Sequence, residues 1–214
     1  MYGFDETTAT GGGNFGKIAA GIVENINLKD ISYDHLKADG SGDKVIKFVF
    51  ADDAGATFTH IEFPIDFAQR LQLAKGWGKS TADAEAYVKQ EYEAQGERIK
   101  HILSCFIPKD KCVVKADSFE NFAQGIIKLI GDNHRNVPVR IKTVYKGTSG
   151  YTTFPKRALK PFIQNMKEPN RLAIDPKWDN VTPPVPDNDT YNTTSVFAED
   201  KKEQSYDSAA DAPW

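Results

Sequence analysis

Apolar and polar residues alternate along several stretches of the chain, which is the pattern of β-strands with one buried face. The first stretch is residues 21–34, and the next two are residues 44–51 and 56–63, which are rich in β-branched and aromatic side chains. A glycine-containing turn at residues 38–43 and a tight connection at residues 52–55 separate them. We therefore expect three consecutive antiparallel strands.

The pattern then becomes helical. Ser80 followed by Asp83 is typical of a capping box and predicts a helix that runs to Phe106. A second helix is predicted from Ser118 to a cap at Gly131, because its apolar residues form one continuous stripe. The two helices make an insertion at roughly residues 79–132, and we expect them to cover one end of a sheet.

Alternation returns at residues 137–146, where one face is apolar and the other is cationic. The cationic face carries Arg140, Lys142 and Lys146. Such a strand is expected to bury its apolar face and to offer the other face to an anion. A fifth strand is predicted at residues 151–154, and residues 156–166 fit either a short helix or an extended segment.

Charge divides the chain sharply. Residues 134–178 contain ten Lys or Arg and two acids, a net charge of +8, whereas residues 179–214 contain two lysines and eight acids, a net charge of −6. The total of −3 hides this asymmetry. Aromatic residues are interspersed in the basic stretch: Tyr145, Tyr151, Phe154, Phe162 and Trp178. Cations beside aromatic rings suit a phosphate backbone with exposed bases, so this stretch is predicted to bind nucleic acid.

Other motifs favour no cofactor or metal. The segment from Gly11 to Lys17 has the spacing of a phosphate-binding loop, but Ile18 stands where that loop needs Ser or Thr for magnesium. We expect residues 1–20 to be a flexible, glycine-rich arm. The two cysteines cannot form a disulfide framework, and no Cys or His pair has zinc spacing.

Catalysis and membrane insertion are also not expected. The four histidines are scattered, and the aspartate pairs at residues 39 and 43 and at residues 52 and 53 fall in predicted turns. The chain shows no signal peptide and no apolar run long enough to cross a bilayer. We therefore expect a soluble, cytoplasmic protein that is not an enzyme and has no membrane partner.

Three strands, a helical insertion, two more strands and an acidic tail ending in Asp211-Ala-Pro-Trp214 resemble the OB-fold single-stranded-DNA-binding proteins of bacteria and phages. The resemblance covers the architecture of residues 21–155 and the tail. The large helical insertion departs from the bacterial family and is more like the divergent phage type. The oligomeric state therefore stays open.

The resemblance implies a mainly β fold with a helical insertion, built as a five-stranded OB-like barrel in the order β-β-β-α-β-β with disordered termini. The nucleic-acid-binding domain would be residues 21–178, and the acidic disordered tail would be residues 179–214. The resemblance also implies that the protein binds single-stranded DNA without sequence specificity in replication, recombination or repair. If the protein is viral, this binding would take place in the host cytoplasm. The tail would recruit partner proteins through Asp211, Pro213 and Trp214.

The alternation of side chains between the two faces of each predicted strand indicates which residues bind nucleic acid. Phosphate contacts are expected from Arg140, Lys142, Lys146, Lys156 and Arg157, and further groove contacts from Lys47, Phe58 and His60. Tyr151 and Phe154 point to opposite faces of one strand, so at most one of them stacks on a base while the other packs in the core. The alternatives are RNA binding or a nucleoprotein scaffold on the same fold, an adaptor for an acidic partner, or a nucleic-acid-processing enzyme.

Overall fold

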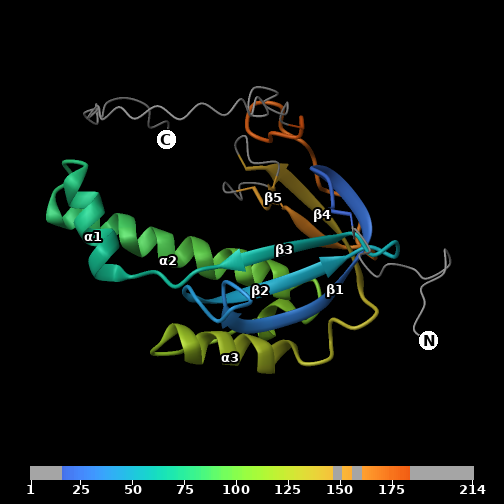
Figure 1. Ribbon diagram of the computed structural model, residues 1–214, viewed down its shortest axis with the longest axis horizontal. Helices are drawn as coiled ribbons and strands as arrows, with labels where there is room; N and C mark the ends of the chain where they lie inside the picture. Colours follow the sequence, from blue (N-terminus) through green and yellow to red (C-terminus); the bar gives the residue numbers. More distant parts are fainter. Residues whose placement is uncertain (1–15, 147–150, 156–160, 184–214) are drawn as a thin grey trace, which may run out of the picture. The chain divides into compact units, whose positions relative to one another are not determined.

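The computed structural model describes residues 16–146, 151–155 and 161–183. These residues lie in one compact unit, Met1–Pro184. Its elements in chain order are β1 (Gly21–His35), β2 (Lys44–Ala51), β3 (Thr57–Glu62), α1 (Phe67–Gly76), α2 (Thr81–Leu103), a short 3-10 helix (Lys109–Lys111), α3 (Phe119–Ile130), β4 (Pro138–Tyr145), β5 (Thr152–Thr153) and β6 (Ile163–Asn165) (Figure 1).

The strands form one antiparallel sheet in the order β3-β2-β1-β4-β5, with β6 also paired to β4. Three consecutive strands followed by a fourth that returns beside the first make a Greek key. β1 pairs with β4 through its first half and with β2 through its second half. Its register shifts twice, and Asn25 adopts a positive φ of 59° at the first shift. These irregularities bend β1, which lets the sheet curl.

The described strands form an open sheet of six strands rather than the expected five-stranded OB-like barrel, whereas the expected mainly β fold with a helical insertion is confirmed. In the described part, β3 and β5 contact each other but share no ladder of hydrogen bonds. Residues just before β1 bridge these two edges instead. The amide of Ile18 donates to the carbonyl oxygen of Thr57 on β3 at 3.1 Å, and the hydroxyl of Thr152 on β5 donates to the Ile18 carbonyl at 3.2 Å. The end of the predicted flexible arm is therefore packed on the sheet.

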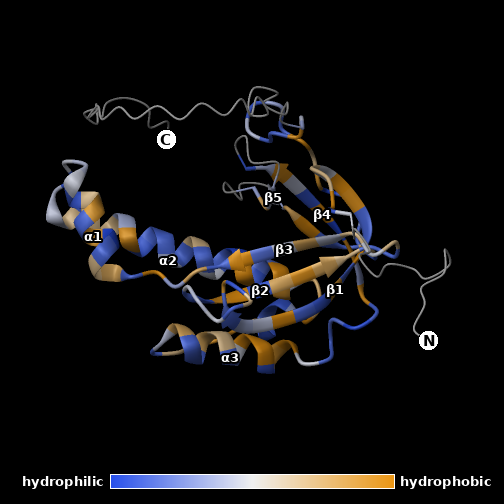
Figure 2. Ribbon diagram, in the orientation of Figure 1, coloured by the Kyte–Doolittle hydropathy of each residue, from blue (hydrophilic) through white to orange (hydrophobic). Residues whose placement is uncertain are grey.

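The core lies between the curled sheet and the helices α2 and α3. Buried Phe48 and Ile141 from the sheet join Ile102 of α2 and Ile126 of α3 in one cluster. Figure 2 shows hydrophobic residues along β2 and along α3. Each such side chain contributes about 1.5–3 kcal/mol when it is fully buried. This core fixes the positions of the strand ends that carry the candidate site.

The predicted helices are confirmed, whereas the helix α1 and the short 3-10 helix were not predicted. The Ser80 hydroxyl caps α2 by accepting from the Asp83 amide at 3.2 Å, and Ser118 caps α3 in the same way. The helix α1 buries only Ala74. Its sequence therefore lacks the regularly spaced apolar residues that would predict a helix. The strand β6 lies in the stretch for which a helix and an extended segment were both expected, and its three residues are too few for alternation to decide between them.

Candidate nucleic-acid interface

β4 is covered on both faces, contrary to the expectation of an exposed cationic face. Arg140 and Lys142 keep only 6% and 3% of their surfaces exposed. The Arg140 guanidinium lies 3.5 Å from the Glu24 carboxylate and donates to the carbonyl oxygen of Met166. Because residues 161–183 pack across this face, both cations face protein groups rather than solvent. The orientation predicted for these two residues is corrected accordingly.

Lys142 has a buried carboxylate partner from the end of the folded unit. Its ammonium group donates to Asp179 Oδ2 at 2.8 Å and to the carbonyl oxygen of Ala173 at 3.0 Å. The same Asp179 oxygen accepts from the Asp175 amide at 2.7 Å. Asp179, which charge alone assigned to the acidic tail, is therefore part of the folded unit. A buried charge of this kind is tolerated only when it is paired.

Phe58, His60 and Phe154 are core residues. The Phe154 ring lies 4.8 Å from the Phe58 ring and 4.9 Å from the His60 ring, centroid to centroid. Phe58 and His60 pair across the strands with Phe50 and Phe48, so their side chains share the apolar face of β2. Their predicted place in a solvent-facing groove is wrong. The prediction that Tyr151 and Phe154 differ is confirmed, because Phe154 is buried and Tyr151 is 60% exposed.

A polar network allows His60 to be buried beside aromatic rings. Glu62 accepts from His60 Nε2 at 2.9 Å and from Arg98 Nε at 2.9 Å. Burial alone would raise the pKa of Glu62, but the hydrogen bonds from His60 and Arg98 outweigh it and lower the pKa to about 2. The carboxylate is thus charged at neutral pH and ties β3 to α2. This arrangement is that of a structural ion pair.

Two exposed aromatic rings with neighbouring lysines lie near the end of β4. The Lys17 ammonium sits 4.1 Å from the centroid of Tyr151, and the Lys177 ammonium sits 5.0 Å from the ring of Trp178. Trp178 is 54% exposed. We call Lys17, Lys146, Tyr151, Lys177 and Trp178 the β4-end platform.

Hydrogen bonds to the last residues of β4 hold both halves of the platform. The amide of Lys146 donates to the carbonyl oxygen of Tyr151 at 2.9 Å. The amide of Tyr145 donates to the backbone carbonyl oxygen of Asn180 at 2.7 Å, and Asn180 is two residues beyond Trp178. The backbone segments that carry the two rings therefore both lie against the end of β4, although the rings are 27 positions apart in the sequence.

Sequence reasoning found part of this platform. Lys146 and Tyr151 are among the binding residues that the sequence predicts. The sequence does not predict Lys17, which lies in the glycine-rich segment, or Lys177 and Trp178 as binding residues. The signal for Trp178 was its place beside a lysine, immediately before the charge changes sign. Lys47, another predicted contact, is half-buried and donates to the carbonyl oxygen of His35.

The remaining predicted residues lie outside the described ranges. They are Lys156, Arg157, Asp211, Pro213 and Trp214. Lys156 and Arg157 follow Tyr151 by five and six positions, so they are close to the platform along the chain.

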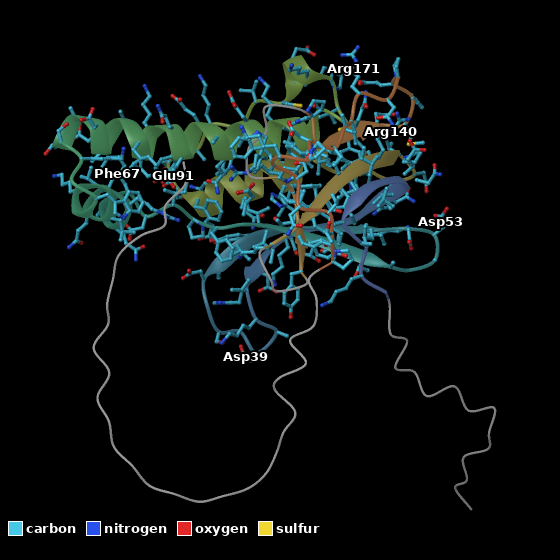
Figure 3. The ribbon with its side chains drawn as sticks, turned by 90° about the horizontal axis from the view of Figure 1, so that it is seen from above. Asp39, Asp53, Phe67, Glu91, Arg140 and Arg171 are labelled. Carbon is cyan, nitrogen blue, oxygen red and sulfur yellow. The ribbon has the colours of Figure 1, made fainter. Side chains whose placement is uncertain are left out.

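The groups that could support other chemistry are dispersed. Within the described residues, no three His, Cys, Asp or Glu side chains gather as a metal site. Asp39 and Asp53 lie on separate loops (Figure 3). Burial raises the pKa of the Cys105 thiol to about 12, which makes it a poor nucleophile at neutral pH. None of the described helices combines the length and the apolar character needed to span a bilayer.

Comparisons with known proteins identify no relative. The chain matches no protein-family model, and neither curated proteins nor solved structures give a significant match.

Proposed function

We propose that this protein binds single-stranded DNA without sequence specificity, as a non-enzymatic component of replication, recombination or repair. The observation that carries the proposal is the β4-end platform, in which two exposed rings each have a lysine at cation–π distance. Every base has a π-face, so stacking on Tyr151 and Trp178 is indifferent to sequence. The lysines supply the charge that a phosphate backbone requires.

Each group of the platform has a distinct role in this mechanism. Stacking on an aromatic ring is worth about 1–3 kcal/mol per base. Lysine contacts with phosphates release condensed counterions, which makes the affinity fall steeply with salt. Lys156 and Arg157 extend the same basic stretch in the sequence, and we include them among the proposed phosphate contacts.

The Greek-key order of the sheet supports an OB-like relationship, since the OB-fold is a partly open Greek-key barrel that binds nucleic acids. In this proposal residues 16–19 lie between β3 and β5, where direct pairing of these two strands would close a barrel. The acidic segment beyond residue 184 would recruit partner proteins, with Trp214 as the apolar anchor and Asp211 as a flanking charge.

The test is a titration of labelled oligonucleotides monitored by fluorescence anisotropy over a series of salt concentrations. Tight binding to single-stranded DNA, weaker binding to duplex DNA and RNA, and a steep salt dependence are expected. The Tyr151→Ala/Trp178→Ala variant should lose affinity. Val113→Ala is the control, because Val113 is similarly exposed and lies outside the platform.

Three results would overturn parts of the proposal. Unchanged affinity of the platform variant would remove the stacking surface, and a flat salt response would remove the electrostatic mechanism. Equal or tighter binding to RNA of the same sequence would instead favour the RNA-binding or nucleoprotein-scaffold alternative.

A further inference from the structure

α1 and α2 form a helical hairpin that extends beyond the sheet. α2 has 23 residues and is therefore about 35 Å long, yet only Ile99, Ile102 and Leu103 near its end belong to the main core. The first half of α2 buries Ala84 and Val88, on the part of the helix that pairs with α1. Figure 1 shows α1 and this half of α2 away from the strands. The hairpin is thus an arm that lies outside the main core, apart from the end of α2.

The arm is held together by its own contacts. Arg70 of α1 lies 3.6 Å from the Glu91 carboxylate of α2, and the Tyr92 hydroxyl donates to the carbonyl oxygen of Ile65 at 2.7 Å. The Trp77 and Tyr87 rings meet edge to face at 5.7 Å. Figure 3 shows Phe67 and Glu91 on this arm, far from Arg140. The arm can therefore present a defined surface.

The hairpin exposes several large apolar side chains. Five of the nine large hydrophobic side chains that are exposed among the described residues lie on the hairpin or at its root: Phe63, Phe67, Leu73, Trp77 and Tyr92. Leu73 and Trp77 are four residues apart and share one face of α1. Phe67 lies about a quarter turn away around the same helix. The face of α1 that carries Leu73 and Trp77 is therefore a candidate interaction surface.

The two helices of the arm carry opposite charges. Residues 67–79 contain three basic residues and no acid, whereas residues 81–97 contain five acids and one lysine. Two copies of the hairpin can be related by a two-fold axis so that each basic α1 lies beside the acidic α2 of the other copy. The same arrangement would bury Leu73 and Trp77 of both copies, because an isologous interface uses the same surface of each copy.

We propose that the α1–α2 hairpin is a self-association surface, and that two copies of this chain pair through it as an antiparallel four-helix bundle. Leu73 and Trp77 supply the buried anchors, since aromatic residues carry much of the energy of protein interfaces. The charges of the two helices set the orientation. This pairing is independent of strand binding, because the β4-end platform lies on other elements.

The experiment measures mass by sedimentation velocity over a range of concentrations. The intact protein should form a dimer that dissociates on dilution, and Leu73→Glu/Trp77→Glu should be monomeric. Val113→Glu is the matched control, because Val113 is equally exposed outside the hairpin and should leave the dimer intact. A monomer at every concentration, or growth beyond two copies, would overturn the proposal.

Charge reversal gives a second test that leaves the apolar side chains unchanged. Lys75→Glu/Lys79→Glu and Glu85→Lys/Glu93→Lys should each weaken the dimer, because each variant places like charges across the interface. An equal mixture of the two variants should recover dimers, which would be heterodimers. If the mixture stays monomeric while both variants remain folded by circular dichroism, the pairing of α1 with α2 is wrong.

Discussion

At the scale of single residues, Tyr151 and Phe154 occupy opposite environments only three positions apart. Tyr151→Ala should weaken binding to a single strand by about 1–3 kcal/mol and leave the thermal midpoint unchanged. Phe154→Ala should lower the free energy of unfolding by about 3–5 kcal/mol, because it opens a cavity beside Phe50, Phe58 and Phe162. Anisotropy titration and urea denaturation of both variants would check this. Unfolding of both would show that Tyr151 is also a packing residue.

Lys142 is a second residue whose role follows from its surroundings. Lys142→Ala should destabilise the protein by about 3–5 kcal/mol, because it leaves the buried carboxylate of Asp179 without its cation. Lys142→Met/Asp179→Leu should recover part of this loss, since both charges are then removed. Urea denaturation measures both effects. Lys37→Ala, at an exposed lysine, is the control, and equal destabilisation by both lysine variants would contradict the importance of the buried pair.

The alternation of β4 shows what a sequence can and cannot predict about a residue. It predicted correctly that Arg140 and Lys142 lie on one side of the strand. It did not predict what covers that side. The groups that pair with the two cations, Met166 and Asp179 among them, are more than 20 positions away, and no local period reports such contacts.

At the scale of elements, strands with one buried face and capped amphipathic helices were predictable, and elements stabilised by few long-range contacts were not. β2 agrees with its prediction at both ends because glycine-containing turns bound an apolar run. α1 was missed because it packs through one alanine and leaves its larger apolar side chains exposed. The open sheet was also not predictable. Its edge strands β3 and β5 are bridged by residues 16–19 instead of pairing with each other, and composition alone assigned those residues to a flexible arm.

The contact between β3 and α2 makes a prediction about acid stability. The lowered pKa of Glu62, about 2 in the folded protein against 4.5 for the free side chain, stabilises the fold above pH 4.5. This contribution, about 3 kcal/mol at about 1.4 kcal/mol per pKa unit, should be lost as the pH falls from 4.5 toward 2.

Denaturation of Glu62→Gln across this pH range would check the effect. The variant should be less stable at neutral pH and should lose much of the pH dependence below 4.5. Glu97→Gln, at an exposed position of α2, should retain the pH dependence of the native protein. If the two variants behave alike, the ion pairs of Glu62 do not stabilise the fold.

At the scale of the whole molecule, the reversal of charge near residue 178 was the most informative feature of the sequence. It marks the end of the basic stretch that contains Lys146, Tyr151 and Trp178 of the proposed binding platform. It placed the end of the folded unit too early, because charge does not reveal that the Asp179 carboxylate is buried against Lys142. The part of the compact unit that the structure describes extends to residue 183.

This boundary separates two deletions that charge alone would treat as equivalent. Residues 185–214 contain seven acids and two lysines, so removing them takes negative charge away from a protein proposed to bind a polyanion. Deleting them should tighten binding to single-stranded DNA at low salt, with a smaller effect at high salt, because the repulsion is screened. The thermal midpoint should stay unchanged.

Deleting residues 179–214 should give a different result. This deletion also removes Asp179, which pairs with Lys142, and Asn180, which accepts from the Tyr145 amide beside the β4-end platform. The longer deletion should therefore lower the thermal midpoint and weaken strand binding, even though it removes more negative charge. Anisotropy titrations and thermal denaturation of both truncated proteins would check this. If both bind more tightly and are equally stable, residues 179–183 act only through their charge and the platform does not depend on them.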